Sequence, residues 1–264
     1  MDNNIQELLY RFKICVTLDD YKEALNCFDK IINEIEEYNL EEIEIINRLS
    51  KVIYKESTKI LNTLINIEQN SEEEDKNIIN FYMNYIHDDC LSIIRRLLFD
   101  IQLMENKIKN EIAIALINKI KGKLHSFFFK YDDNDKSGNL EKALFSYKKA
   151  IKIIILNNEK KNNDNDIDED TNESIIKFKI LFSYCKFCKN CLKDYYRCIL
   201  FCSNVIKDIK KELENNEVDG ENIDDEYEEN LQILLGKFNN FYEDNVETYN
   251  RVIKVYFPEI KKYA

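Results

Sequence analysis

The chain has 264 residues, among them 4 Gly, 1 Pro and no Trp. So few turn-forming residues argue against a β-sandwich or an α/β sheet, because strand ends in those folds need them. The net charge of −12 argues against nucleic acid as the main partner, since phosphate backbones select basic surfaces. No apolar run reaches the roughly 18–20 residues that span a bilayer. We therefore expect an all-α protein of the cytoplasm with no membrane contact, whose 8 Cys stay reduced.

Apolar residues recur at helical spacing along nearly the whole chain, as in the stretch from Ile5 to Leu18. In chain order, the predicted helices cover about residues 5–18, 21–35, 40–69, 75–105, 107–131, 140–157, 174–192, 194–214 and 227–244. A loop containing Gly138 is expected at 132–139. Residues 157–173 are acidic and low in complexity, so we predict a disordered loop there. A second acidic loop is expected at 214–226.

The segment 246–263 adds an amphipathic stretch, VETYNRVIKVYFPEIKKY, which Pro258 is expected to end or kink. Its apolar side chains need a surface to cover them. We therefore predict a helical domain over residues 1–245 and an additional C-terminal helix or tail over 246–264. This tail would pack on the body or lie in or near a binding groove as an internal ligand.

Several segments together point to a known family. The run Asn39-Leu40-Glu41-Glu42 opens a long predicted helix that closes with Ile67-Glu68-Gln69. Lys119-Ile-Lys-Gly122 is followed by three aromatic residues at 127–129. Shorter matches are Leu91-Ser92-Ile93-Ile94, Phe182-Ser183, Tyr227 and Asn239-Asn240. Over about residues 5–245 the chain resembles the 14-3-3 proteins, which are phosphoprotein-binding adaptors. The resemblance implies nine antiparallel helices, no enzymatic activity, no cofactor and a concave groove for phosphopeptide segments of partner proteins.

The resemblance also implies a phosphate pocket, to which Lys51, Lys119 and Asn240 correspond. The other pocket positions differ. They hold Thr58 and Ser126 in place of arginines, Phe127 in place of a tyrosine, Leu181 in place of an asparagine and Asp244 in place of a tryptophan. Hydrogen bonds to a charged group contribute roughly 1.5–3 kcal/mol each. We therefore predict a degraded pocket with weak or no binding of a standard phosphoserine peptide.

Three further lysines are candidates for compensating cations in the groove, namely Lys55, Lys59 and Lys123. Lys51, Lys55 and Lys59 follow one another at intervals of four, which places them along one side of a helix. The alternative interpretation is that these lysines belong to ordinary solvated helix faces.

A homodimer is a further implication of the resemblance, with apolar contacts from Ile14, Leu18 and Ile79. The positions of the family's flanking ion pairs hold Asp20, Glu23, Ile78 and Tyr82, so those pairs are broken. A second interpretation starts from the segments ALNCFDKII and ALFSYKKAIKI, which resemble tetratricopeptide helices. Under that alternative the protein is a helical scaffold that binds unmodified partners.

Five cysteines lie in one stretch, at Cys185, Cys188, Cys191, Cys198 and Cys202. The spacing is reminiscent of an iron–sulfur or zinc motif. It lacks the Cys-Pro ending of a bacterial ferredoxin run and has no histidine neighbour. The stretch is also periodic in Phe, Leu and Ile, so we interpret the cysteines as filling a helix face and predict no metal site.

The segment from Asp133 to Glu141 imitates the first nine positions of a calcium loop. The twelfth position, which requires a bidentate Glu, holds Leu144, so we do not predict calcium binding. The two histidines, His87 and His125, have no evident nucleophile or acid partner, and no Gly-rich phosphate loop is present. No catalytic site is predicted.

Overall fold

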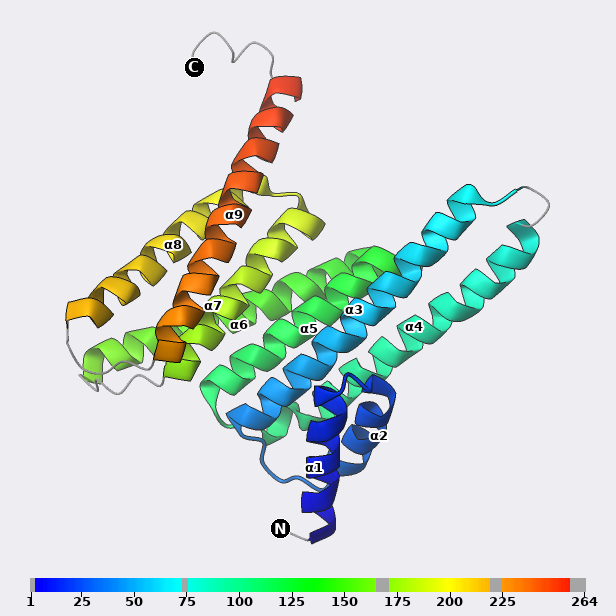
Figure 1. Cartoon of the computed structure of the whole chain (residues 1–264), viewed down its shortest axis with the longest axis horizontal. Coiled ribbons are helices and arrows are strands. Elements are labelled where there is room, and N and C mark those ends of the chain that lie inside the picture. The colour runs from blue at the N-terminus through cyan, green and yellow to red at the C-terminus, as the bar shows by residue number, and fades with distance from the viewer. Residues whose placement is uncertain (1–2, 73–75, 165–170, 219–224, 257–264) are drawn as a thin grey trace. The chain divides into compact units, whose positions relative to one another are not determined.

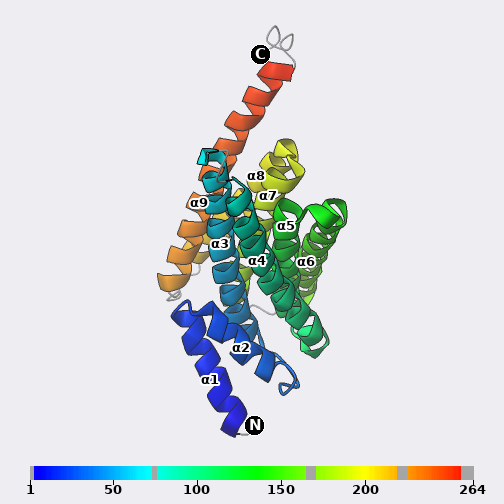
Figure 2. The same ribbon diagram turned by 90° about the vertical axis from the view of Figure 1, so that its right-hand side faces the viewer.

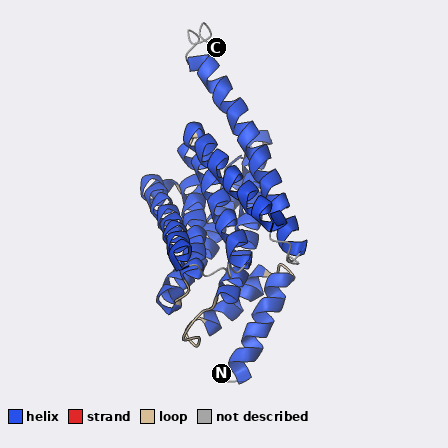
Figure 3. Ribbon diagram, turned by 90° about the vertical axis from the view of Figure 1, so that its left-hand side faces the viewer, coloured by secondary structure: helices blue, strands red, loops and turns tan. Residues whose placement is uncertain are grey.

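The computed structural model describes residues 3–72, 76–164, 171–218 and 225–256. Across these residues it has nine α-helices, three short helical turns and no strand (Figure 3). The predicted all-α class is thereby confirmed. The chain divides into two compact units, Met1–Ala150 and Ile151–Ala264, with the division inside one long helix.

The first unit begins with α1 (Asn3–Thr17), α2 (Tyr21–Ile31), α3 (Leu40–Asn70), α4 (Lys76–Met104) and α5 (Glu111–Tyr131). It also contains η1 (Glu105–Lys107), η2 (Asp133–Asp135) and the first half of α6 (Lys136–Asp164). Helices α1 and α2 pack together, and α3 packs against both α4 and α5 (Figures 1 and 2). The long antiparallel pair of α3 and α4 gives this unit two extended helix faces.

The start of α3 is determined by its own sequence. The Asn39 side chain accepts a hydrogen bond from the Glu42 backbone N–H at 3.0 Å. The Glu42 carboxylate accepts one from the Asn39 N–H, also at 3.0 Å. This reciprocal capping box satisfies two backbone donors that a helix end otherwise leaves unpaired. The predicted opening of the long helix at Asn39 is therefore confirmed.

Aromatic and aliphatic side chains fill the interior of the first unit. Phe12 stacks on Phe28 with ring centroids 5.6 Å apart, which joins α1 to α2. Gly122 allows α5 and α6 to approach closely, because a Cβ at this position would lie 2.8 Å from the Tyr147 ring. The glycine of the Lys119–Gly122 motif thus has a packing role.

The second unit contains the rest of α6, then α7 (Thr171–Phe187), α8 (Tyr195–Val218) and α9 (Asp225–Tyr256). A π-helical turn, η3 (Cys188–Leu192), connects α7 to α8 and ends at Lys193, whose φ of 55° is left-handed. All three helices pack on one another. The Phe182 ring meets Phe238 at 4.9 Å and Phe241 at 5.5 Å, which holds α7 against α9.

Three predicted loop boundaries are wrong, because helices extend into polar sequence. Helix α6 begins at Lys136, where the Asp135 carboxylate accepts a hydrogen bond from the Gly138 N–H at 3.1 Å. It continues to Asp164, and α8 continues to Val218. Glu and Lys have high helix propensity, so a charged run can extend a helix that packing has already established. Residues 165–170 and 219–224 of the expected loops lie outside the described residues.

No separate helix starts at residue 246, because α9 runs unbroken from Asp225 to Tyr256. Phe241, Asn245 and Val252 repeat at helical spacing, and Asn245 is fully buried. The amphipathic segment therefore continues α9 through the expected boundary at 245. Residues 257–264, including Pro258, lie outside the described residues. None of the described helices is long and apolar enough to cross a membrane.

Candidate functional site

The three lysines of the α3 ladder are all solvent-exposed. Lys51, Lys55 and Lys59 lie on α3, whose opposite side packs into the core through residues such as Ile46 and Ile53. The sequence prediction that these side chains share one exposed side of the helix is consistent with this arrangement. Their positions relative to α5 differ, as the contacts between α3 and α5 show.

Two contacts between α3 and α5 show which face of α3 lies against α5. The Lys119 ammonium on α5 donates to the Asn47 amide oxygen at 2.6 Å. One turn further along, the Lys123 ammonium lies 4.4 Å from the centre of the Tyr54 ring. Asn47, Lys51 and Tyr54 are spaced by four and three residues, so Lys51 lies between these two contacts on the same face.

We call Lys51, Tyr54, Lys119 and Lys123 the α3–α5 lysine face. Lys55 and Lys59 each lie about 100° further around α3 than Tyr54 and Thr58, so they flank this face rather than belong to it. The structure thus places Lys119 and Lys123 of the predicted site against α3, at Asn47 and Tyr54, and Lys51 lies between these two residues along α3. Their common location depends on the packing of α5 on α3.

The three lysines of this face differ in exposure. Lys119 is only 2% exposed and its ammonium is occupied by Asn47, so it serves to join α5 to α3. Lys123 is half-buried against Tyr54, and Lys51 is exposed. A ligand at the surface therefore meets Lys51 and the outer side of Lys123, while Lys119 lies beneath them.

Three positions that the sequence resemblance pairs with two pocket arginines and a pocket tyrosine cannot supply those groups here. The Ser126 hydroxyl donates to the Gly122 carbonyl at 2.7 Å, and Phe127 is completely buried. Thr58 is half-buried, and its hydroxyl oxygen has no hydrogen-bond partner. None of these side chains can replace a guanidinium that grips phosphate with two parallel hydrogen bonds.

Asn240, the remaining predicted pocket residue, is exposed on α9 in the second unit. Leu181 is half-buried on α7. Asp244 is exposed and forms an ion pair with Lys189. The second unit thus presents an exposed amide and a carboxylate near the middle of α9, without an aromatic side chain at position 244.

The predicted dimer contacts lie on exposed apolar faces of the first unit. Ile14 is exposed on α1, Leu18 follows its last turn with 73% exposure, and Ile79 is half-buried on α4. Large exposed side chains lie beside them, namely Tyr10 on α1 and Ile78, Phe81, Tyr82 and Tyr85 on α4. The sequence interpretation named Ile78 and Tyr82 only as positions of broken ion pairs, and it missed Tyr10, Phe81 and Tyr85. Their helical spacing is the signal that could have identified them.

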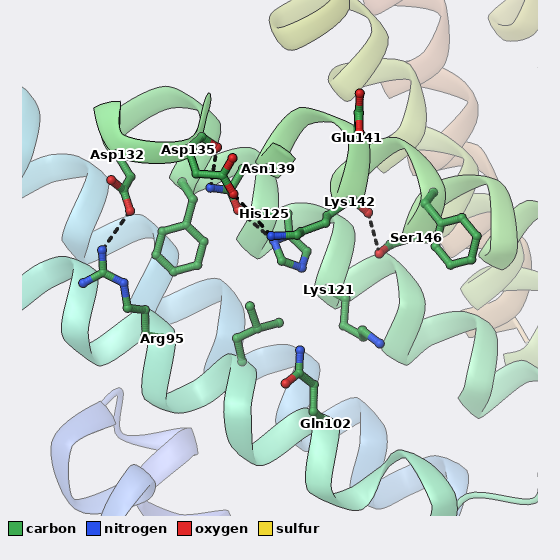
Figure 4. Close-up of a pocket in the computed structure, with 13 residues that line it drawn as sticks. Arg95, Gln102, Lys121, His125, Asp132, Asp135, Asn139, Glu141, Lys142 and Ser146 are labelled. Carbon is green, nitrogen blue, oxygen red and sulfur yellow. Dashed lines mark hydrogen bonds and ion pairs between the residues drawn. The ribbon is translucent and has the colours of Figure 1, made fainter. Parts of the chain in front are cut away.

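A pocket of about 900 Å³ lies between α4, α5 and α6, with charged residues along its walls (Figure 4). The positive residues are Arg95, Lys121 and Lys142, and the negative ones are Asp132, Asp135 and Glu141. Because these charges balance, the pocket has no net attraction for phosphate. Its polar groups also pair internally, since Arg95 contacts Asp132 at 2.8 Å and Lys142 contacts Asp135 at 3.3 Å.

His125 in this pocket donates a hydrogen bond from its Nδ1–H to the Asn139 side-chain oxygen at 3.1 Å. Burial lowers the pKa of His125, which favours the neutral ring at pH 7. Nearby, the pKa of Glu105 is held below its ordinary value by Lys121 and Lys149, although burial acts in the opposite direction. The pocket therefore contains structural polar pairs and no extra cation for an anionic ligand.

The calcium-like segment adopts a helical conformation. Residues 133–135 form η2, and α6 begins immediately after it. Asp133 pairs with Lys136 at 2.6 Å, while Asp135 pairs with Lys142. Because each carboxylate is directed to a lysine, the segment does not form the ring of convergent oxygen ligands that calcium requires.

The fold and the α3–α5 lysine face define an all-helical protein with a local cationic surface on a chain of net charge −12. No protein-family model matches the chain, and no curated protein matches it. The resemblance to 14-3-3 proteins thus rests on the sequence segments described above.

Proposed function

We propose that this protein is a non-enzymatic, 14-3-3-like adaptor that binds acidic or phosphorylated segments of partner proteins at the α3–α5 lysine face. The observation that carries the proposal is the pairing of α5 with α3 through Lys119–Asn47 and Lys123–Tyr54. These contacts hold Lys123 against α3 at Tyr54, which lies three residues beyond Lys51 on that helix. Two neighbouring cations on an acidic protein provide a defined place for an anionic segment.

Weak affinity follows from the chemistry of this face. Lysine offers a point charge on a flexible chain, whereas arginine offers a rigid fork that matches two phosphate oxygens. Lys119 is already bound to Asn47, and Ser126 and Phe127 point into the protein interior. Binding should therefore be phosphate-dependent, salt-sensitive and weaker than that of an arginine-based pocket.

A labelled phosphoserine peptide tests the proposal by fluorescence anisotropy. We expect phosphorylation to strengthen binding, and the double variant Lys51→Gln/Lys123→Gln to weaken it by about tenfold, which corresponds to about 1.4 kcal/mol. The matched control is Lys22→Gln/Lys30→Gln, which removes the same charge from exposed positions on α2. Equal losses in both double variants would show that only net charge matters.

Phosphate-independent binding would favour the alternative of a tetratricopeptide-type scaffold for unmodified partners. Tight binding that survives Lys51→Gln/Lys123→Gln would contradict the proposed location of the site.

We further propose that the protein forms a homodimer through the apolar faces of α1 and α4. In the first unit, Ile78, Phe81, Tyr82 and Tyr85 of α4 are each between 61% and 72% exposed. Tyr10, Ile14 and Leu18 present a second apolar surface at α1. Two-fold pairing of α1 with the partner's α4 would cover both surfaces at once. Apolar contacts at Ile78 and Tyr82 would then replace the family's ion pairs.

Sedimentation equilibrium tests this dimer. We expect a dimer at micromolar concentration and a monomer for Phe81→Asp/Tyr85→Asp, because buried unpaired carboxylates disfavour an interface. Phe145→Asp/Tyr196→Asp is the control, since both aromatic rings are exposed on other helices. A wild-type protein that sediments as a monomer at this concentration would refute the dimer.

A further inference from the structure

Three of the five clustered cysteines converge inside the second unit. Cys185 lies on α7, and Cys198 and Cys202 lie one turn apart on α8. Their sulfur atoms all lie within 4.8 Å of one another, and the Cys185 and Cys202 sulfurs are 3.4 Å apart. All three residues are completely buried. Among the described residues, no other group of three His, Cys, Asp or Glu side chains converges in this way.

This spacing matches the needs of a metal ion. Zinc binds thiolate sulfur at about 2.3 Å, so three sulfurs around one ion lie about 3.7–4.0 Å apart. The Cys185–Cys202 separation of 3.4 Å is slightly shorter than this range, and the other two separations do not exceed 4.8 Å. Small side-chain rotations would bring the three sulfurs to the distances that one ion requires. Cysteines that only fill space along a helix face do not need to have their sulfur atoms close to one another. The convergence across α7 and α8 therefore distinguishes this group from ordinary packing.

Local backbone geometry is a second, independent observation. The connection between α7 and α8 consists of the π-turn η3 and Lys193 in a left-handed conformation. π-Turns are rare and are frequently found at functional sites, and a left-handed non-glycine residue carries a conformational cost. The unusual connection lies between the helix that carries Cys185 and the helix that carries Cys198 and Cys202.

The geometry points to a binding site for a thiophilic divalent cation of the zinc type at Cys185, Cys198 and Cys202. Binding converts three thiols and one M²⁺ ion into a tris-thiolate complex of charge −1 and releases three protons. A monovalent ion such as Cu(I) would leave a charge of −2 in this buried place, which is costlier.

Cadmium titration of the full-length, reduced and metal-free protein tests the site, because Cd(II)–thiolate bonds absorb in the ultraviolet. We expect one Cd(II) per chain by native mass spectrometry, and competition by Zn(II) for the same site. Mg(II), which prefers oxygen ligands, should not compete.

Cys202→Ser and Cys185→Ser should each weaken Cd(II) binding by about 100-fold or more, since each removes a direct ligand. The controls are Cys191→Ser, half-buried in the same unit, and Cys27→Ser, buried in the first unit. Far-ultraviolet circular dichroism of these variants and of Cys202→Ala shows whether a variant that binds less Cd(II) is still folded. A folded variant with weaker binding has lost a metal ligand. Absence of the wild-type cadmium absorption, or equal losses in the cluster and control variants, would overturn the proposal.

Discussion

Replacement of Phe127 by alanine is expected to lower the free energy of unfolding by about 3–5 kcal/mol. Phe127 is completely buried, and its ring lies 4.7 Å from Tyr131 and 5.5 Å from Tyr54. Truncation removes these aromatic contacts and leaves a cavity between α3 and α5. Urea unfolding followed by circular dichroism measures the change.

Phe145→Ala provides the matched control, because Phe145 is 69% exposed and its loss should change stability by less than about 0.5 kcal/mol. Similar effects for the two variants would contradict the assignment of Phe127 to the core. The result also bears on the proposed function, because the sequence resemblance to 14-3-3 proteins pairs Phe127 with a pocket tyrosine. A completely buried Phe127 cannot contact a phosphate at the surface.

Asp100→Asn is expected to stabilise the protein at pH 8 but to have little effect at pH 4. Asp100 is buried on α4. Burial, followed by hydrogen bonding and repulsion from Asp29, raises the pKa of Asp100 to about 7, although Arg96 acts to lower it. Tyr38 also faces Asp100. Between pH 4 and 7 the folded protein therefore holds a proton that the unfolded chain releases.

Stability consequently falls as pH rises through this window, by at most about 1.4 kcal/mol per pH unit. The asparagine variant stays neutral and escapes this loss. Urea unfolding at pH 4, 6 and 8 measures the difference, which should reach about 2 kcal/mol at pH 8 after screening by nearby Arg96. Asp133→Asn, with a side chain that is 88% exposed, is the control. A difference that does not grow with pH would rule out the raised pKa.

Much of the fold follows from local sequence signals. The Asn39–Glu42 capping box and the polar break after Asn70 determine both ends of α3, and the predicted limits of 40–69 differ by one residue from the structure. The predicted helix limits were wrong where the prediction relied on the composition of a segment and not on a specific capping or turn signal. Residues 157–164 are all polar, yet they extend α6, because helix propagation needs no apolar residue once the helix exists.

The candidate site was predicted only in part. The four-residue spacing correctly placed Lys51, Lys55 and Lys59 on the exposed side of one helix. It could not show that Lys119 is buried beneath that side, because the Asn47 partner lies 72 residues away in the chain. The exposed aromatic residues Phe81 and Tyr85 could have been found from their helical spacing. The burial of Ser126 could not, because it depends on packing between helices.

The sequence by itself determined that this protein is all-helical, since scarce Gly and Pro and a persistent helical period act within each segment. Only the tertiary structure decided which lysines and which cysteines meet. Helical periodicity defines a face within one helix, but it does not determine the partner of that face. The packing of α5 on α3 created the lysine face, and the packing of α8 on α7 brought the Cys185 thiol to the thiols of Cys198 and Cys202.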